Sequence, residues 1–211
     1  MPWIATVRRV DGYCERLGPG LLGEPLNAVS NAAFLLAAAY LIGRRPRSLL
    51  LPVLLAVVGL CSLAFHTFAT PATGALDSLS ILLFVLTGIV LLTRHGFGAR
   101  ASRAWLAAPA FIAFAVLVIV VVRDALSGYL PALLALAGFA VGLRDRLLGA
   151  ATAVFALSLT VRTLDEPLCS ALPIGTHWLW HCLNAVVLTL VAVAVNARTQ
   201  RAGQHLATLL P

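Results

Sequence analysis

The chain has very little charge and no lysine. Only 11% of its 211 residues are Asp, Glu, Lys or Arg, and 61% are hydrophobic, whereas a soluble domain carries about 25% charged residues. A soluble fold of this length cannot bury so much apolar surface, so the composition predicts a polytopic membrane protein. The net charge of +7 comes from arginines in short loops between apolar runs. Membrane topology explains such arginines better than a nucleic-acid partner, which we do not expect.

The sequence also lacks the usual marks of a secreted or multidomain protein. Residues 1–9 contain neither an apolar core of about 7–15 residues nor a small-residue cleavage site, so they do not resemble a cleavable signal peptide. No soluble segment, long linker or internal repeat interrupts the remainder. We therefore expect a single domain over residues 1–211.

What the chain has in abundance is apolar runs. Each run approaches the ~20 residues that a helix needs to cross the hydrocarbon core. They cover residues 26–42, 49–67, 75–93, 104–122, 129–143, 147–164 and 176–196. The fifth is short, and a re-entrant fifth segment would leave six spans. The preferred prediction is an all-α membrane protein with seven transmembrane helices.

The arginines predict the orientation of these helices. With the N-terminus outside, ten arginines fall on the inner side and five on the outer side. This is the asymmetry that the positive-inside rule favours. We therefore expect the N-terminus outside and the C-terminus in the cytoplasm.

Five polar side chains lie inside these apolar runs, and the topology puts all five near the outer leaflet. They are Ser62, His66, Asp77, His177 and His181. An aspartate at the centre of a membrane helix costs roughly 2.5–3.5 kcal/mol on insertion scales. Such residues are retained where they satisfy one another around an ion, a proton path or a ligand. Function is therefore expected at this cluster.

The spacing of the histidines is that of a metal site. His177 and His181 are four residues apart, so they share one helix face, as do histidine pairs in helical zinc sites. His66 would add a third imidazole, which leaves a fourth position for water, as in catalytic zinc sites. Asp77 is placed to accept and return a proton. Ser62 is placed to donate a hydrogen bond to a developing oxyanion.

Other interpretations of these residues remain open at this stage. Single polar residues in membrane helices often only link helices by hydrogen bonds. A bis-histidine haem would use two of the histidines but would give Asp77 no role. Asn184 shares a helix face with His177 and is either a neighbour of the metal site or a packing residue.

A second polar group precedes and begins the first helix. Glu15, Glu24 and Asn27 offer the hard oxygen ligands that Ca²⁺ prefers. Glu24 is equally well explained as a carboxylate at a helix N-terminus, where it suits the helix dipole. Calcium at this position is thus one of two interpretations.

Together these motifs resemble those of the alkaline ceramidases. The matching elements are Cys14-Glu15, the run from Glu24 to Asn31, Ser62-x-x-x-His66, Asp77 and His177-x-x-x-His181. Alkaline ceramidases belong to a superfamily of seven-helix membrane hydrolases that includes the adiponectin receptors. The resemblance implies a zinc-dependent amidase that cleaves ceramide or a related N-acyl lipid. It also implies zinc on the three histidines, Asp77 as acid and base, and Ser62 as the oxyanion donor.

The chain departs from that family at the calcium motif. Gly12, Tyr13 and Leu17 stand where the family has Asp, Trp and Asn, so any calcium effect should be weaker than with the full motif. The length and the lysine-free composition look bacterial. This suggests a multi-pass protein of a bacterial inner membrane, whose lipid need not be a sphingolipid.

Two alternative functions stay open on sequence alone. One is a protein of the adiponectin-receptor or haemolysin-III type, which the short spacing from His66 to Asp77 and the N-outside orientation disfavour. The other is a transporter or a haem-binding membrane protein, which visible haem absorbance would favour. The oligomeric state is not indicated.

The four cysteines divide by their predicted location. Cys14 and Cys169 both fall on the outer side, where an oxidising compartment permits a disulfide. We predict that they pair and tie the N-terminal segment over the histidine cluster. Cys61 and Cys182 lie within apolar runs and are expected to be free thiols.

Overall fold

The structure is a computed structural model that describes residues 10, 12–18, 20, 22–124 and 126–207, without the side chains of residues 203 and 205–207. Within that part of the chain all regular secondary structure is helical, which confirms the all-α prediction. The helices are α1 (Pro25–Ser30), α2 (Ala32–Gly43), α3 (Leu50–Phe68), α4 (Pro71–Gly96), α5 (Ala101–Ala104), α6 (Ala107–Val122), α7 (Leu130–Gly142), α8 (Arg146–Thr163), α9 (Asp165–Leu168) and α10 (His177–Ala207).

Several of these helices suit a membrane. In the described chain, five helical segments are long and apolar enough to cross one: Pro25–Gly43, Leu50–Phe68, Pro71–Gly96, Ala101–Val122 and His177–Ala202. Helix α7 is apolar but only 13 residues long. Helix α8 carries an arginine near each end, Arg146 and Arg162. The structure thus supports a multi-pass membrane protein, and five of the seven expected spans meet these criteria.

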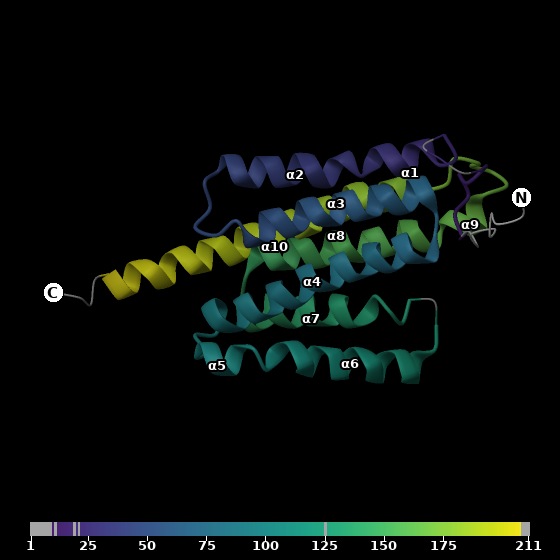
Figure 1. Cartoon of the computed structure of the whole chain (residues 1–211). Coiled ribbons are helices and arrows are strands. Elements are labelled where there is room, and N and C mark those ends of the chain that lie inside the picture. Colours follow the sequence, from purple (N-terminus) through teal and green to yellow (C-terminus); the bar gives the residue numbers. More distant parts are fainter. Residues whose placement is uncertain (1–9, 11, 19, 21, 125, 208–211) are drawn as a thin grey trace, which may run out of the picture.

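Helix α10 lies at the centre of the bundle. It packs against α8, α2, α4 and α1, and Figure 1 shows it running between them. Helices α5 and α6 lie along one edge, and Phe111 is the only buried residue described in α6. Helices α2 and α3 approach closely because Gly59 has no side chain: a Cβ there would lie 2.8 Å from Cβ of Phe34. Such small residues are typical of membrane helix contacts.

Two helix boundaries differ from the apolar runs by four residues or more. Helix α4 begins at Pro71 rather than at residue 75, because the Thr70 side chain caps the helix in a capping box with Thr73. Helix α10 continues to Ala207 rather than ending at residue 196, and Arg198 in this extension forms an ion pair with Asp145. Partial burial disfavours the charge of Asp145, but hydrogen bonds from Leu148 and Arg198 hold its pKa below the ordinary value.

The alternating direction of the helices gathers several termini at one end of the bundle, here called the α9 end. Helices α3 and α8 end there, and α1, α4 and α10 begin there, beside α9 (Figure 1). The C-terminal part of α10 extends beyond the bundle at the opposite end. The polar residues singled out in the sequence therefore lie at a single end of the bundle.

Candidate metal centre

Three buried histidines converge at the α9 end. His66 comes from the last turn of α3, and His177 and His181 come from the first two turns of α10. One ligand nitrogen from each ring lies within 4.8 Å of those of the other two. The spacing of four residues puts His177 and His181 on the same face of α10, where their ring centroids are 4.6 Å apart. The three imidazoles thus form a cluster that could hold a metal ion.

Two of the rings are oriented by partners from the first helix and its start. Glu24 accepts a hydrogen bond from Nδ1 of His66 at 2.5 Å. The hydroxyl of Ser30 lies 2.7 Å from Nδ1 of His181. When Nδ1 of an imidazole is engaged in this way, Nε2 is left free for a metal ion. The segment from Glu24 to Ser30 therefore acts as the outer support of the cluster.

Aromatic rings orient the third histidine. The His177 ring stacks on two aromatic rings. The Tyr13 ring centroid is 3.9 Å away, and the Trp180 ring is nearly parallel to the His177 ring with its centroid 5.2 Å away. Burial raises the pKa of the Tyr13 phenol above its ordinary value, so the ring that covers His177 stays uncharged at neutral pH.

The atoms of the cluster fit a metal ion. Nδ1 of His177 and Nε2 of His181 are buried and have no hydrogen-bond partner among the described residues. A buried polar atom without a partner is costly, and a metal ion would satisfy both nitrogens. Three imidazoles suit zinc and other transition metals.

Ser62 and Asp77 lie beside the histidines, as the sequence suggested. Ser62 is one helical turn before His66 and is buried. Asp77, near the start of α4, is half-buried and interacts electrostatically with His66 and with the Ser62 side chain. Neither the Ser62 hydroxyl nor Oδ1 of Asp77 has a hydrogen-bond partner among the described residues. Both groups are thus available to a bound substrate or water.

A large cavity with mostly apolar walls adjoins the cluster. Its volume is about 810 Å³, within the roughly 300–1,000 Å³ typical of ligand pockets. Asp77, His177 and Asn184 form part of its lining, so Asn184 faces the cavity. Leu82 of α4 and Ile112 of α6 also line it and are exposed on the outer face of the bundle. The cavity is therefore placed to admit an apolar chain from the side, between α4 and α6.

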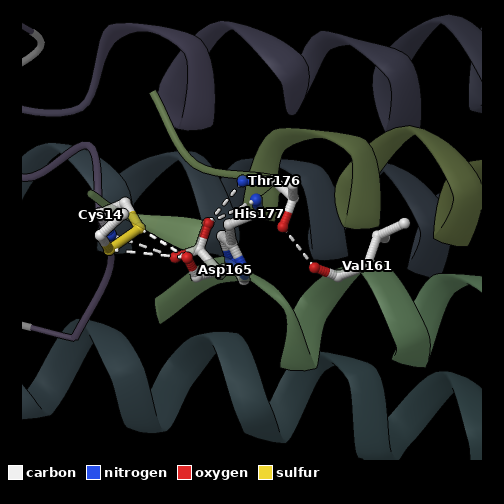
Figure 2. Close-up of a disulfide and its surroundings, with 6 residues drawn as sticks. Cys14, Val161, Asp165, Thr176 and His177 are labelled. Carbon is white, nitrogen blue, oxygen red and sulfur yellow. Dashed lines mark hydrogen bonds between the residues drawn. A yellow bond between two sulfur atoms is a disulfide. The ribbon is translucent and has the colours of Figure 1, made fainter. Parts of the chain in front are cut away.

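A disulfide lies beside the Asp165 carboxylate at the α9 end (Figure 2). Cys14 and Cys169 form a disulfide with a Cα–Cα distance of 5.3 Å, the pair expected from the sequence, and Cys61 and Cys182 are free. Asp165 is buried and accepts hydrogen bonds from the backbone N–H groups of Thr176 and His177, at 2.6 and 2.9 Å, and from that of Cys14. A carboxylate at this position suits the N-terminus of α10.

Gly175 makes this arrangement possible, and its replacement should destabilise the protein. Its φ of +61° is one that L-residues rarely adopt, and a Cβ would lie 2.2 Å from Oδ1 of Asp165. We expect Gly175→Ala to destabilise the folded protein by at least ~1–2 kcal/mol, the cost of placing an L-residue in a left-handed conformation. The detergent-solubilised variant should therefore melt at a lower temperature than the wild type. Gly138→Ala is the matched control, because a Cβ there meets nothing within 4 Å. Equal melting temperatures for the two variants would contradict this account.

The three residues considered for calcium have other partners in the structure. The two oxygens of Glu15 accept hydrogen bonds from the backbone N–H groups of Leu26 and Asn27 at 2.6 and 2.7 Å. Glu24 forms a buried ion pair with Arg16 and accepts from the Asn27 side chain at 3.0 Å. A guanidinium thus neutralises the carboxylate that would otherwise attract a cation.

We therefore expect no calcium to bind at Glu15, Glu24 and Asn27, because Glu15 and Glu24 are already engaged. The measurement is calorimetric titration of the purified protein with Ca²⁺, together with its melting temperature with and without calcium. Saturable binding at micromolar calcium, lost in Glu15→Gln, would contradict the expectation.

Ser30 is expected to tune the metal affinity. Ser30→Ala removes the partner of His181 Nδ1 and should weaken zinc binding by about 10–100-fold, the usual cost of losing such a partner. Competition with a zinc chelator of known affinity measures this change. The exposed Ser102 provides the control Ser102→Ala, which should bind zinc like the wild type. If Ser30→Ala also binds zinc like the wild type, the supporting role of Ser30 is wrong.

Sequence reasoning missed several residues around the cluster. Asp165 was not singled out, because no short motif links it to Thr176 and His177. Arg16 is one of the five arginines expected on the outer side, and nothing in the sequence marks it as the partner of Glu24, with which it pairs in the structure. Ser30 lies in a motif that the sequence displayed, but only the folded chain brings it to His181.

No protein-family model matches the chain, and no curated protein matches its sequence. The likeness to alkaline ceramidases rests on the motif residues themselves.

Proposed function

We propose that the chain is a zinc-dependent amide hydrolase of the membrane, which cleaves ceramide or a related N-acyl lipid into a long-chain amine and a free fatty acid. One observation carries the proposal: three buried imidazoles converge beside a carboxylate and a hydroxyl, next to a largely apolar cavity. A polar cluster alone would suit many proteins. The cavity favours a substrate with a long apolar chain, which reaches the cluster from the membrane without entering water.

The proposal includes the topology. We infer seven spans, with α7 and α8 completing the five segments of membrane-spanning length. The chain lies in a bacterial inner membrane, with its N-terminus outside and its C-terminus in the cytoplasm. The α9 end, with its disulfide, then faces the oxidising side and places the site near the outer leaflet. This orientation is supported by the arginine distribution.

Each polar side chain then has a chemical task. A zinc ion held by His66, His177 and His181 would activate water and polarise the amide carbonyl. Asp77 takes up the proton of the attacking water and delivers it to the departing amine, because an amine leaves poorly as an anion. Ser62 donates a hydrogen bond to the carbonyl oxygen as negative charge develops on it.

Product analysis by mass spectrometry tests the proposal. Purified protein in nanodiscs is incubated with a panel of N-acyl lipids, with His181→Ala as the inactive control. Free fatty acid and the matching amine should appear together with the wild type and not with the variant. If no lipid of the panel is cleaved by the zinc-loaded wild type, the proposal fails. Visible haem absorbance would favour a haem protein instead.

A further inference from the structure

Among the described residues that line the cavity, Arg162 is the only arginine, and the sequence contains no lysine. It belongs to the last turn of α8, at the α9 end. A basic residue suits a helix C-terminus in any protein. At a fully hydrated surface the helix dipole would be reason enough for an arginine at this position. The Arg162 side chain, however, borders a cavity whose lining is mostly apolar.

The Arg162 guanidinium has no anionic partner in the described part of the chain. None of the ion pairs found there includes it. Its Nε is buried and has no hydrogen-bond partner among the described residues. The guanidinium lies over the Tyr129 ring, 4.9 Å from the centroid, a contact that holds the cation in place without neutralising it. The Arg162 side chain is half-buried, so part of this charge lies beside apolar walls without an anion to pair with it, which is unfavourable.

Arg162 is also close to the metal centre. It shares the cavity lining with Tyr13, Asp77 and His177. Its positive charge acts on the Tyr13 phenol and opposes the rise that burial causes in the pKa of that group. Tyr13 in turn stacks on His177. An anion bound by Arg162 would therefore lie near any amide placed at the histidine cluster, while Asp77 remains free of Arg162 for proton transfer.

We propose that Arg162 binds an anionic group of the substrate, a carboxylate or a phosphate located close to the scissile amide. This inference rests on the proposed hydrolase function and narrows its substrate to acidic N-acyl lipids. The guanidinium fork matches the paired oxygens of both anions. A neutral headgroup would leave the cation without a partner. The acyl chain occupies the apolar part of the cavity, lined by residues such as Phe84, Leu136, Phe155 and Leu188.

The test compares lipids that differ only in charge. N-palmitoylglycine is compared with its neutral analogue N-palmitoylglycinamide, and ceramide 1-phosphate with ceramide, by release of palmitate. The first pair tests a carboxylate and the second a phosphate. In at least one pair, the wild type should prefer the anion in kcat/KM by roughly 10–100-fold, the size of one charge-assisted interaction. Arg162→Gln should bring that ratio close to one.

Matched variants separate recognition from folding. The readout is a ratio between two substrates of one enzyme, so a general loss of activity does not mimic the result. Arg162→Lys keeps the charge without the fork and should retain part of the preference. Arg123, exposed near the same end, provides the control Arg123→Gln, which should keep the full ratio. A wild-type ratio near one in both pairs, or a ratio preserved in Arg162→Gln, overturns the inference.

A binding measurement distinguishes this failure from failure of the hydrolase. Trp180 lines the cavity, so a brominated fatty acid that binds there should quench its fluorescence. The wild type should bind the brominated acid more tightly than the matching brominated alcohol, and Arg162→Gln should bind both alike. If this preference is found but no lipid is hydrolysed, the hydrolase fails and the anion site stands. If lipids are hydrolysed but neither assay shows a preference for the anion, the anion site fails and the hydrolase stands.

Discussion

Replacing His181 by alanine is expected to remove most of the bound zinc and, with it, all measurable amide hydrolysis. His181 is completely buried, and its Nε2 has no other partner among the described residues. Losing a ligand should weaken zinc binding by more than the roughly 10–100-fold that loss of an outer partner costs. Elemental analysis of purified protein gives the zinc content per chain, and fatty acid release gives the activity.

The matched control is a histidine outside the cluster. His95 lies in the last turn of α4, at the end of the bundle opposite α9. His95→Ala should keep one zinc per chain and full activity. Size-exclusion chromatography of His181→Ala should show that the variant still inserts and folds, because the surrounding helix contacts remain. Full zinc occupancy in folded His181→Ala would contradict the assignment of this ligand.

Replacing Asp77 by asparagine should also impair catalysis strongly, but without loss of the metal. Asn has nearly the shape of Asp but cannot take up and return a proton. Proton transfer by a positioned side chain typically contributes about 10²–10⁴-fold, so kcat should fall by that factor. Zinc content should be unchanged, since Asp77 lies beside the histidine cluster and is not one of its three members.

Two comparisons make the Asp77 result specific. Ser62→Ala removes one hydrogen-bond donor and should lower kcat by about 10²–10³-fold while zinc stays bound, so Asp77→Asn should be the more severely impaired. Asp124→Asn changes an exposed loop carboxylate in the same way and should be fully active. Unchanged fatty acid release by Asp77→Asn would falsify the proton-transfer role.

Much of the architecture could be predicted because a membrane helix requires a continuous run of apolar residues, which local composition reveals. The apolar run at 49–67 became α3 (Leu50–Phe68), and the run at 104–122 became the segment Ala101–Val122. The five polar residues could be grouped because their depth follows from helix order alone. The pair Cys14 and Cys169 could be matched because only these two cysteines lie outside the apolar runs.

The rest depended on tertiary partners that no local pattern specifies. Whether Glu24 faces a metal ion, or Arg16 and His66, is decided by how the N-terminal segment folds over α1 and α3. Asp165 reaches the start of α10 only because Gly175 permits a tight turn. The role proposed for Arg162 depends on the cavity that it borders and on the lack of an ion pair to it among the described residues. Neither property can be read from the sequence around it.

The most direct measurement is a zinc titration of the metal-free wild type, followed by release of free fatty acid from an N-acyl lipid. We expect no release from the metal-free protein. Release should then rise in proportion to added zinc and reach its maximum at one zinc per chain. Full activity in the metal-free protein, or none in protein that has bound one zinc per chain, would contradict this expectation.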